Sequence, residues 1–205
     1  MRKEIKYLLA GILIGGLLVW LLVNSGITSN KSYSMPNSST QMSSEVIDSH
    51  FIEQMIPHHE DAITMAKLAL TKSQKPEVKQ LAENIIKSQS QEITQMKSWY
   101  QNWFGRELPT GDQVMKQHGM MGNNSSMHMG KMGDTSDITN LETSADFDKE
   151  FLEEMIPHHQ MAVMMASMLK NGTSRPEMKQ LADNIITSQT SEIDQMRTWL
   201  KNINN

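Results

Sequence analysis

The sequence contains no cysteine. A chain without thiols has no thiol nucleophile for covalent catalysis and no cysteine to carry a lipid anchor. It also lacks a glycine-rich phosphate-binding loop and the Gly-x-Ser-x-Gly turn that presents a catalytic serine. Enzyme classes that depend on those groups are therefore excluded.

Positive charge is also scarce. The chain has 205 residues and a formal net charge of -4, with no long run of lysine or arginine. Nucleic-acid binding depends on neutralising phosphates with such residues. The sequence therefore argues against nucleic acid as a partner, and its length leaves room for one domain or for two half-sized units that share a core.

Methionine, by contrast, is abundant, with 19 residues. A thioether has no proton to lose and cannot form a disulfide, so it stays a usable soft ligand in an oxidising compartment. Methionine also fills irregular gaps in helical cores, and this role accounts for about half of these residues. The remainder are candidate ligands for a soft metal.

An uncharged, apolar segment lies near the start of the chain, over residues 7–23. It is long enough to cross a bilayer, and the basic residues before it favour a cytoplasmic N-terminus. The pattern predicts a single-pass anchor in the cytoplasmic membrane at residues 1–24 and a flexible tether at residues 25–43. A cleaved signal peptide is the alternative, although no small-x-small site follows the segment. Both interpretations place the rest of the chain outside the cytoplasm.

A tandem duplication occupies most of the remaining sequence. The stretch that begins at Asp48 reappears from Asp148, and the similarity continues without a gap to Trp99 and Trp199. About half of the aligned positions are identical. A repeat of this kind is one supersecondary unit that buries its apolar face against another copy.

Each copy shows apolar residues at helical spacing in two runs, separated by a break before Pro76 or Pro176. The pattern predicts an all-α protein in which two helical hairpins, over residues 44–104 and 144–205, form a four-helix bundle with a pseudo-two-fold axis. Residues 105–143 are predicted to be an insert without helical period. The sequence leaves the oligomeric state open.

The motif Met-Ile-Pro-His-His occurs once in each copy, and it carries the strongest chemical signal. On a helical wheel the first histidine falls at the centre of the apolar stripe, beside the methionine, and the second falls on its flank. A histidine in a core stripe is a polar, metal-competent group where a bundle would otherwise hold leucine. The candidate ligands in these motifs are Met55, His58, His59, Met155, His158 and His159.

The second helix of each hairpin offers a carboxylate and a further thioether to the same interior, Glu92 with Met96 and Glu192 with Met196. Each copy therefore directs histidine, glutamate and methionine towards one core. A structural interpretation stays open beside the metal site. In that interpretation a histidine and a glutamate form a hydrogen-bonded pair that orients the bundle and binds nothing.

The insert concentrates methionine and histidine in a polar segment that has no core to fill. Such clusters suit Cu(I) and Ag(I), which do not require a rigid cage. Zinc is less favoured, because its structural sites use thiolate, imidazole and carboxylate. A low-complexity linker with chance methionines is the alternative. The predicted ligands are Met115, His118, Met120, Met121, Met127, His128, Met129 and Met132.

The doubled motif, each copy followed by a Pro-Glu-x-Lys-Gln-Leu-Ala-x-Asn-Ile-Ile helix, resembles the bacterial family called domain of unknown function 305. The resemblance implies a ferritin-like four-helix bundle, and some exported members bind copper and support copper tolerance. Carried over by position, it implicates Met55, His58, His59, Met65, Met155, His158, His159 and Met165. A ferritin-like di-iron centre needs a Glu-x-x-His pair, and here methionine replaces that glutamate, which favours copper or silver over iron.

These patterns predict an extracytoplasmic copper-binding protein, favouring Cu(I) with Ag(I) as a surrogate and with Cu(II) left open, that acts in metal sequestration, tolerance or delivery. No bond-making chemistry is expected. Its expected partners are metal ions, the membrane, and a copper exporter or another envelope copper protein. Two alternatives remain, a metal-dependent oxidase that uses the bundle histidines and glutamates, and an interaction module without metal.

Overall fold

The computed structural model describes residues 38–109 and 135–203, with side chains over residues 44–109 and 138–203. The predicted anchor at residues 1–24 and the predicted ligands of the insert, Met115 to Met132, lie outside the described residues. Within the described part of the chain, no helix is long and apolar enough to cross a membrane.

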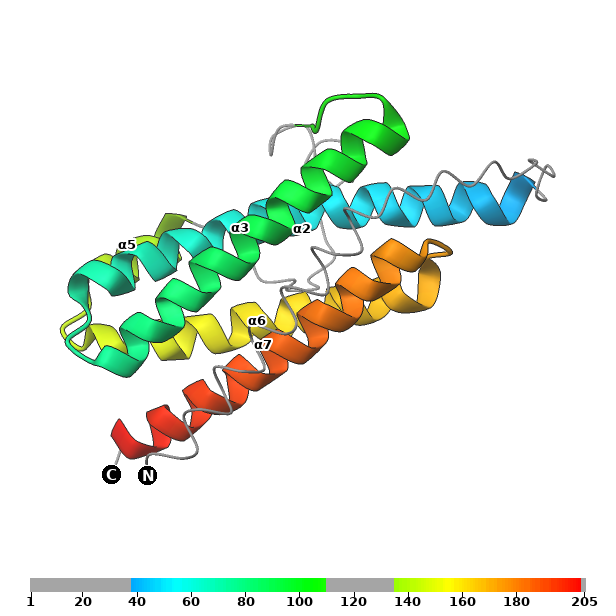
Figure 1. The fold of residues 1–205 in the computed structure, drawn as a ribbon. Helices are drawn as coiled ribbons and strands as arrows, with labels where there is room; N and C mark the ends of the chain where they lie inside the picture. Colours follow the sequence, from blue (N-terminus) through cyan, green and yellow to red (C-terminus); the bar gives the residue numbers. More distant parts are fainter. Residues whose placement is uncertain (1–37, 110–134, 204–205) are drawn as a thin grey trace, which may run out of the picture. The chain divides into compact units, whose positions relative to one another are not determined.

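All the described regular elements are helices, which confirms the predicted all-α class (Figure 1). The first hairpin consists of α2 (Ser38–Lys72) and α3 (Pro76–Phe104), and the second of α6 (Phe147–Gly172) and α7 (Pro176–Ile203). A short helix, α5 (Thr135–Thr143), precedes the second hairpin.

Local sequence explains where these helices begin and end. Pro76 and Pro176 open α3 and α7, where a missing amide proton costs nothing, and an acidic residue follows each. The α6 helix is capped by Asp146, whose carboxylate accepts a hydrogen bond from the Lys149 amide at 3.2 Å. At the end of α3, Gly105 has a φ of 62°, a left-handed conformation that glycine adopts without strain.

The two hairpins pack together mainly through α2 and α6. One apolar cluster joins the first half of α2, from Phe51 to Ile56, to the second half of α6, from Ala162 to Leu169. The other joins the second half of α2 to the first half of α6. The two helices are therefore antiparallel, and the hairpin turns lie at opposite ends of the bundle (Figure 1).

Each hairpin turn is held by a segment outside its own hairpin. The Ser174 amide, in the turn between α6 and α7, donates a hydrogen bond to Ser44 Oγ on α2 at 2.8 Å. In the same turn, Arg175 Nε lies 3.1 Å from Oδ2 of the fully buried Asp48. At the other end, Lys72 Nζ donates to the Glu142 carbonyl of α5 at 2.5 Å. Contacts of this kind fix the register of the two hairpins, and with it the relative height of the two histidine motifs.

Two stretches differ from the sequence-based prediction. The last residues of the predicted tether, from Ser38, belong to α2, because no proline or glycine interrupts the chain between Ser38 and Ile56. Within the predicted aperiodic insert, residues 135–143 form α5, whose Leu141 is fully buried in the second apolar cluster. A helix that buries one leucine shows no detectable apolar period.

Candidate metal centre

His58 and His158 lie face to face at the level where α2 meets α6. Their ring centroids are 3.7 Å apart and their planes are inclined by 38°. His58 is buried and His158 is partly buried. Because the two motifs occupy equivalent positions in antiparallel helices, the pseudo-two-fold axis brings each imidazole against its own counterpart.

The second histidine of each motif pairs with a glutamate from the partner helix of its own hairpin. His59 Nε2 lies 2.6 Å from Glu92 Oε2, and His159 Nε2 lies 2.8 Å from Glu192 Oε2. Both imidazoles are fully buried, whereas the glutamate side chains keep 17% and 14% of their surface exposed. Each carboxylate therefore reaches solvent while it holds a buried ring.

Burial changes the protonation of the central pair. Desolvation, followed by the charges of His59 and His159, lowers the pKa of His58 to about 3. Desolvation, followed by the charge of His58, holds the pKa of His158 well below its ordinary value. Both central imidazoles are therefore neutral at physiological pH, with lone pairs that a metal ion can use.

Several polar atoms of this layer are buried without a hydrogen-bond partner. They include Nδ1 of His58, His59 and His159, and both ring nitrogens of His158. The amide oxygens of the buried Gln89 and Gln189 are also without a partner. Buried polar atoms are normally satisfied by protein or by water, so these ring nitrogens are available to a bound group.

The donor set fits a soft monovalent metal better than a hard one. Where Glu92 accepts a hydrogen bond from the Nε2–H of His59, a neutral ring keeps a free lone pair on Nδ1, the arrangement common at metal-binding histidines. Across the described residues, no three histidine or carboxylate side chains are grouped as an oxygen- or nitrogen-ligated metal site would require. Copper(I) does not require three such ligands, because it accepts a low coordination number and favours imidazole and thioether.

Residues 48–200 match the family model described as domain of unknown function (DUF305). The chain belongs to this family. The resemblance inferred from the doubled motif is thereby confirmed.

The solved structures that resemble this chain include several of CopM. CopM in its Cu(II)-bound form is 52% identical to this chain, over 76% of this chain and 96% of CopM, with a TM-score of 0.64. CopM in its Cu(I)-bound form is 49% identical over 77% of this chain and 98% of its own, with a TM-score of 0.63. CopM was also solved with silver bound, at 48% identity over 76% of this chain and 95% of its own and a TM-score of 0.62.

A curated relative matches a shorter part of the chain. Uncharacterized protein L153 of Acanthamoeba polyphaga mimivirus is 49% identical over 53 residues, which is 26% of this chain. The chain spans about a third of the length of that protein, since the match covers 35% of it.

The other predicted bundle ligands of this DUF305 chain are buried methionines, which the two apolar clusters divide between them. Met55, Met96 and Met165 belong to the first cluster, and Met65, Met155 and Met196 to the second. Packing alone accounts for their burial. Met55 and Met155 each lie one helical turn before a central histidine, which leaves them the best-placed thioethers.

The structure changes the role that the helical wheel assigned to the second histidine. The wheel placed His59 and His159 on the flank of the stripe, but both are fully buried and hold the glutamates. A wheel gives angles within one helix, whereas the flank that faces α3 or α7 depends on how the hairpin closes. The same closure buries Gln89 on α3 and Gln189 on α7.

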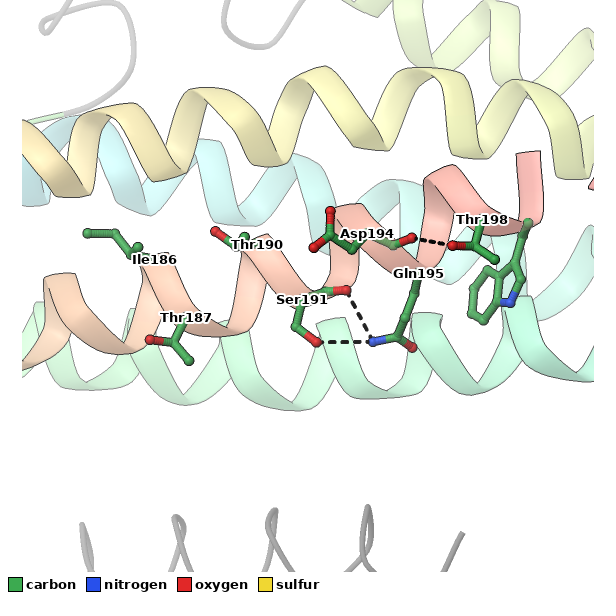
Figure 2. A pocket seen from close by; sticks show the side chains of 8 residues that line it. Ile186, Thr187, Thr190, Ser191, Asp194, Gln195 and Thr198 are labelled. Atoms are coloured by element: carbon green, nitrogen blue, oxygen red, sulfur yellow. Dashed lines mark hydrogen bonds between the residues drawn. The ribbon is translucent and has the colours of Figure 1, made fainter. Parts of the chain in front are cut away.

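A separate hollow of about 690 Å³ opens along one face of α7 (Figure 2). Its lining includes Ile186, Thr190, Asp194 and Trp199, with no histidine or methionine. Ser191 and Gln195 bond to each other within the hollow. These groups offer nothing that a soft metal prefers, so the hollow is unrelated to the histidine layer.

Proposed function

We propose that this DUF305 protein is an extracytoplasmic copper-binding protein that sequesters or delivers Cu(I), with Ag(I) as a surrogate. The single observation that carries the proposal is the layer of His58, His59, His158 and His159. Each of these imidazoles has at least one buried ring nitrogen without a hydrogen-bond partner in the protein. The likeness to CopM, a protein solved with Cu(I), Cu(II) and silver, supports the choice of metal.

The two kinds of histidine have different tasks in this proposal. His58 and His158 present neutral imidazoles from opposite repeats, so a metal bound there ties the two hairpins together. His59 and His159 are oriented by Glu92 and Glu192, which fix the ring that each helix offers. Met55 and Met155 supply soft sulfur one turn away.

The cellular setting of the proposal rests on the N-terminal sequence. The apolar segment within residues 1–24, with basic residues before it, is proposed to be a single-pass anchor whose N-terminus faces the cytoplasm. The bundle and the methionine-rich insert then lie outside the cytoplasm. A copper exporter or another envelope copper protein is the proposed partner, and binding without turnover is the proposed activity.

The test is metal analysis of the purified full-length chain. After exposure to Cu(I), Ag(I), Cu(II), Zn(II) and Fe(II) and removal of free metal, we expect Cu(I) and Ag(I) to be retained most tightly. Replacing the four layer histidines by glutamine should abolish the tightest site. His50→Gln, which removes a histidine outside the layer, is the matched control and should bind normally. Unchanged tight binding by the four-histidine variant would refute the assignment.

A further inference from the structure

One helix of the second copy carries methionines on its outer face, where they have no core to fill. Met168 is 64% exposed and Met164 is 43% exposed, and they are the only exposed methionines with a described side chain. Met161, one turn before Met164, is partly buried at the edge of the first apolar cluster. The three residues lie on α6 at spacings of three and four.

These spacings bring the three side chains together. Residues three or four apart on a helix are neighbours, with Cβ atoms about 5–6 Å apart. Methionine has three rotatable bonds beyond its backbone and a polarisable sulfur, so neighbouring thioethers can converge on one ion without moving the helix. Three neutral sulfurs suit a soft monovalent cation and offer little to Zn(II), Mg(II) or Fe(II).

The first copy provides an internal comparison. The equivalent positions on α2 are occupied by Asp61, Thr64 and Leu68, although the surrounding motif is the same. Leu68 packs against the second apolar cluster, whereas Met168 projects into solvent. The helix therefore forms and packs without methionine at these positions, and neither helix propensity nor core filling explains the exposed thioethers of Met164 and Met168.

We propose that Met161, Met164 and Met168 form a second, solvent-facing site on α6 that binds Ag(I) or Cu(I) through thioether sulfur alone. It shares no residue with the histidine layer. The choice of metal class rests on the proposed function, while the location rests on the exposure and spacing of these side chains. An open site of this kind exchanges metal faster than a buried one, because no packed side chain has to move.

The decisive measurement is the NMR spectrum of full-length chain labelled with 13C at the methionine methyl groups and titrated with Ag(I). We expect the methyl signals of Met161, Met164 and Met168 to shift together. The variant Met164→Thr/Met168→Leu, which restores the residues of the first copy, should bind about one silver ion fewer. Met178→Leu removes a fully buried methionine of the first apolar cluster and is the matched control, expected to bind as the native chain does.

The reciprocal exchange tests sufficiency. Asp61→Met/Thr64→Met/Leu68→Met should gain about one silver ion, since these positions have the same spacing on α2 as the three methionines have on α6. If the three α6 signals do not move at silver saturation, or if the double variant binds as many ions as the native chain, the site does not exist. In the variant that lacks the four layer histidines, the α6 signals should still shift. That outcome would uphold this site even where the histidine layer failed its own test.

Discussion

The low pKa of the central histidines predicts how the metal-free bundle responds to acid. His58 has an unfolded-state pKa near its ordinary value of 6.5 and a folded-state pKa of about 3. Between these two pH values His58 is protonated in the unfolded chain but neutral in the folded chain. The free energy of unfolding therefore falls as pH drops below 6.5. At pH 5 the loss from His58 alone is about 2 kcal/mol, and His158 adds a loss in the same direction.

The assay is urea denaturation of the metal-free full-length chain at pH 7.5 and pH 5, alongside the variant His58→Gln/His158→Gln. Glutamine does not titrate. Between the two pH values the native chain should therefore lose at least about 2 kcal/mol more stability than the variant loses. Comparing the two chains removes the contributions of other groups, including buried Asp48, whose pKa is raised by burial. An identical pH dependence in both chains would show that these imidazoles are not held neutral, and the reasoning would fail.

Three further outcomes follow from the same geometry. Copper bound by His58 and His158 should be retained from pH 7.5 to pH 5 as long as the bundle stays folded, because their low pKa keeps protons from competing for the lone pairs in that range; progressive loss near pH 6.5, seen by dialysis and metal analysis, would contradict this. Glu92→Gln/Glu192→Gln should weaken Cu(I) affinity about ten-fold in competition with a chelator while leaving the circular dichroism spectrum unchanged, since the carboxylates orient the rings. Leu141→Ala should cost about 2–5 kcal/mol in urea unfolding, whereas the exposed Asn140→Ala should cost little, which tests whether α5 is docked.

The helices were predictable because their signals are local. Pro76 and Pro176 mark the two hairpin breaks in the sequence, and apolar periodicity marks the buried faces. The helix α5 was not predictable from the sequence, because Leu141 is its only buried residue with a described side chain and a single apolar position has no period. Its docking depends on packing against the second apolar cluster, whose other residues come from α2, α3, α6 and α7 and leave no mark in the sequence of α5 itself.

The candidate site was predictable in composition but not in pairing. The motif showed that histidine enters the core, and its duplication indicated a symmetric centre. The helical wheel could not show that Glu92 pairs by a hydrogen bond with His59 rather than with His58, because that pairing depends on how α3 packs against α2. The contact of His58 with His158 depends in turn on the antiparallel packing of α2 and α6, which no single helix specifies.

The two copies have diverged away from this shared layer. In the first copy the buried Glu53 accepts a hydrogen bond from the Tyr100 hydroxyl at 2.5 Å and lies 3.2 Å from Arg106. In the second copy the equivalent Glu153 is exposed, and position 200 is leucine. The first copy thus has a buried polar network at the end of α3, whereas the second copy has exposed thioethers on α6.

This divergence bears on why the duplication persists. A single hairpin would expose His58 to water, where its pKa would return towards 6.5 and protons would compete for its lone pair. The second copy supplies both the apolar surroundings and the opposing imidazole that keep the ring neutral. The central layer and the two shared apolar clusters require the copies to match, whereas their outer faces are free to differ, as the exposed Met164 and Met168 of α6 do from Thr64 and Leu68 of α2.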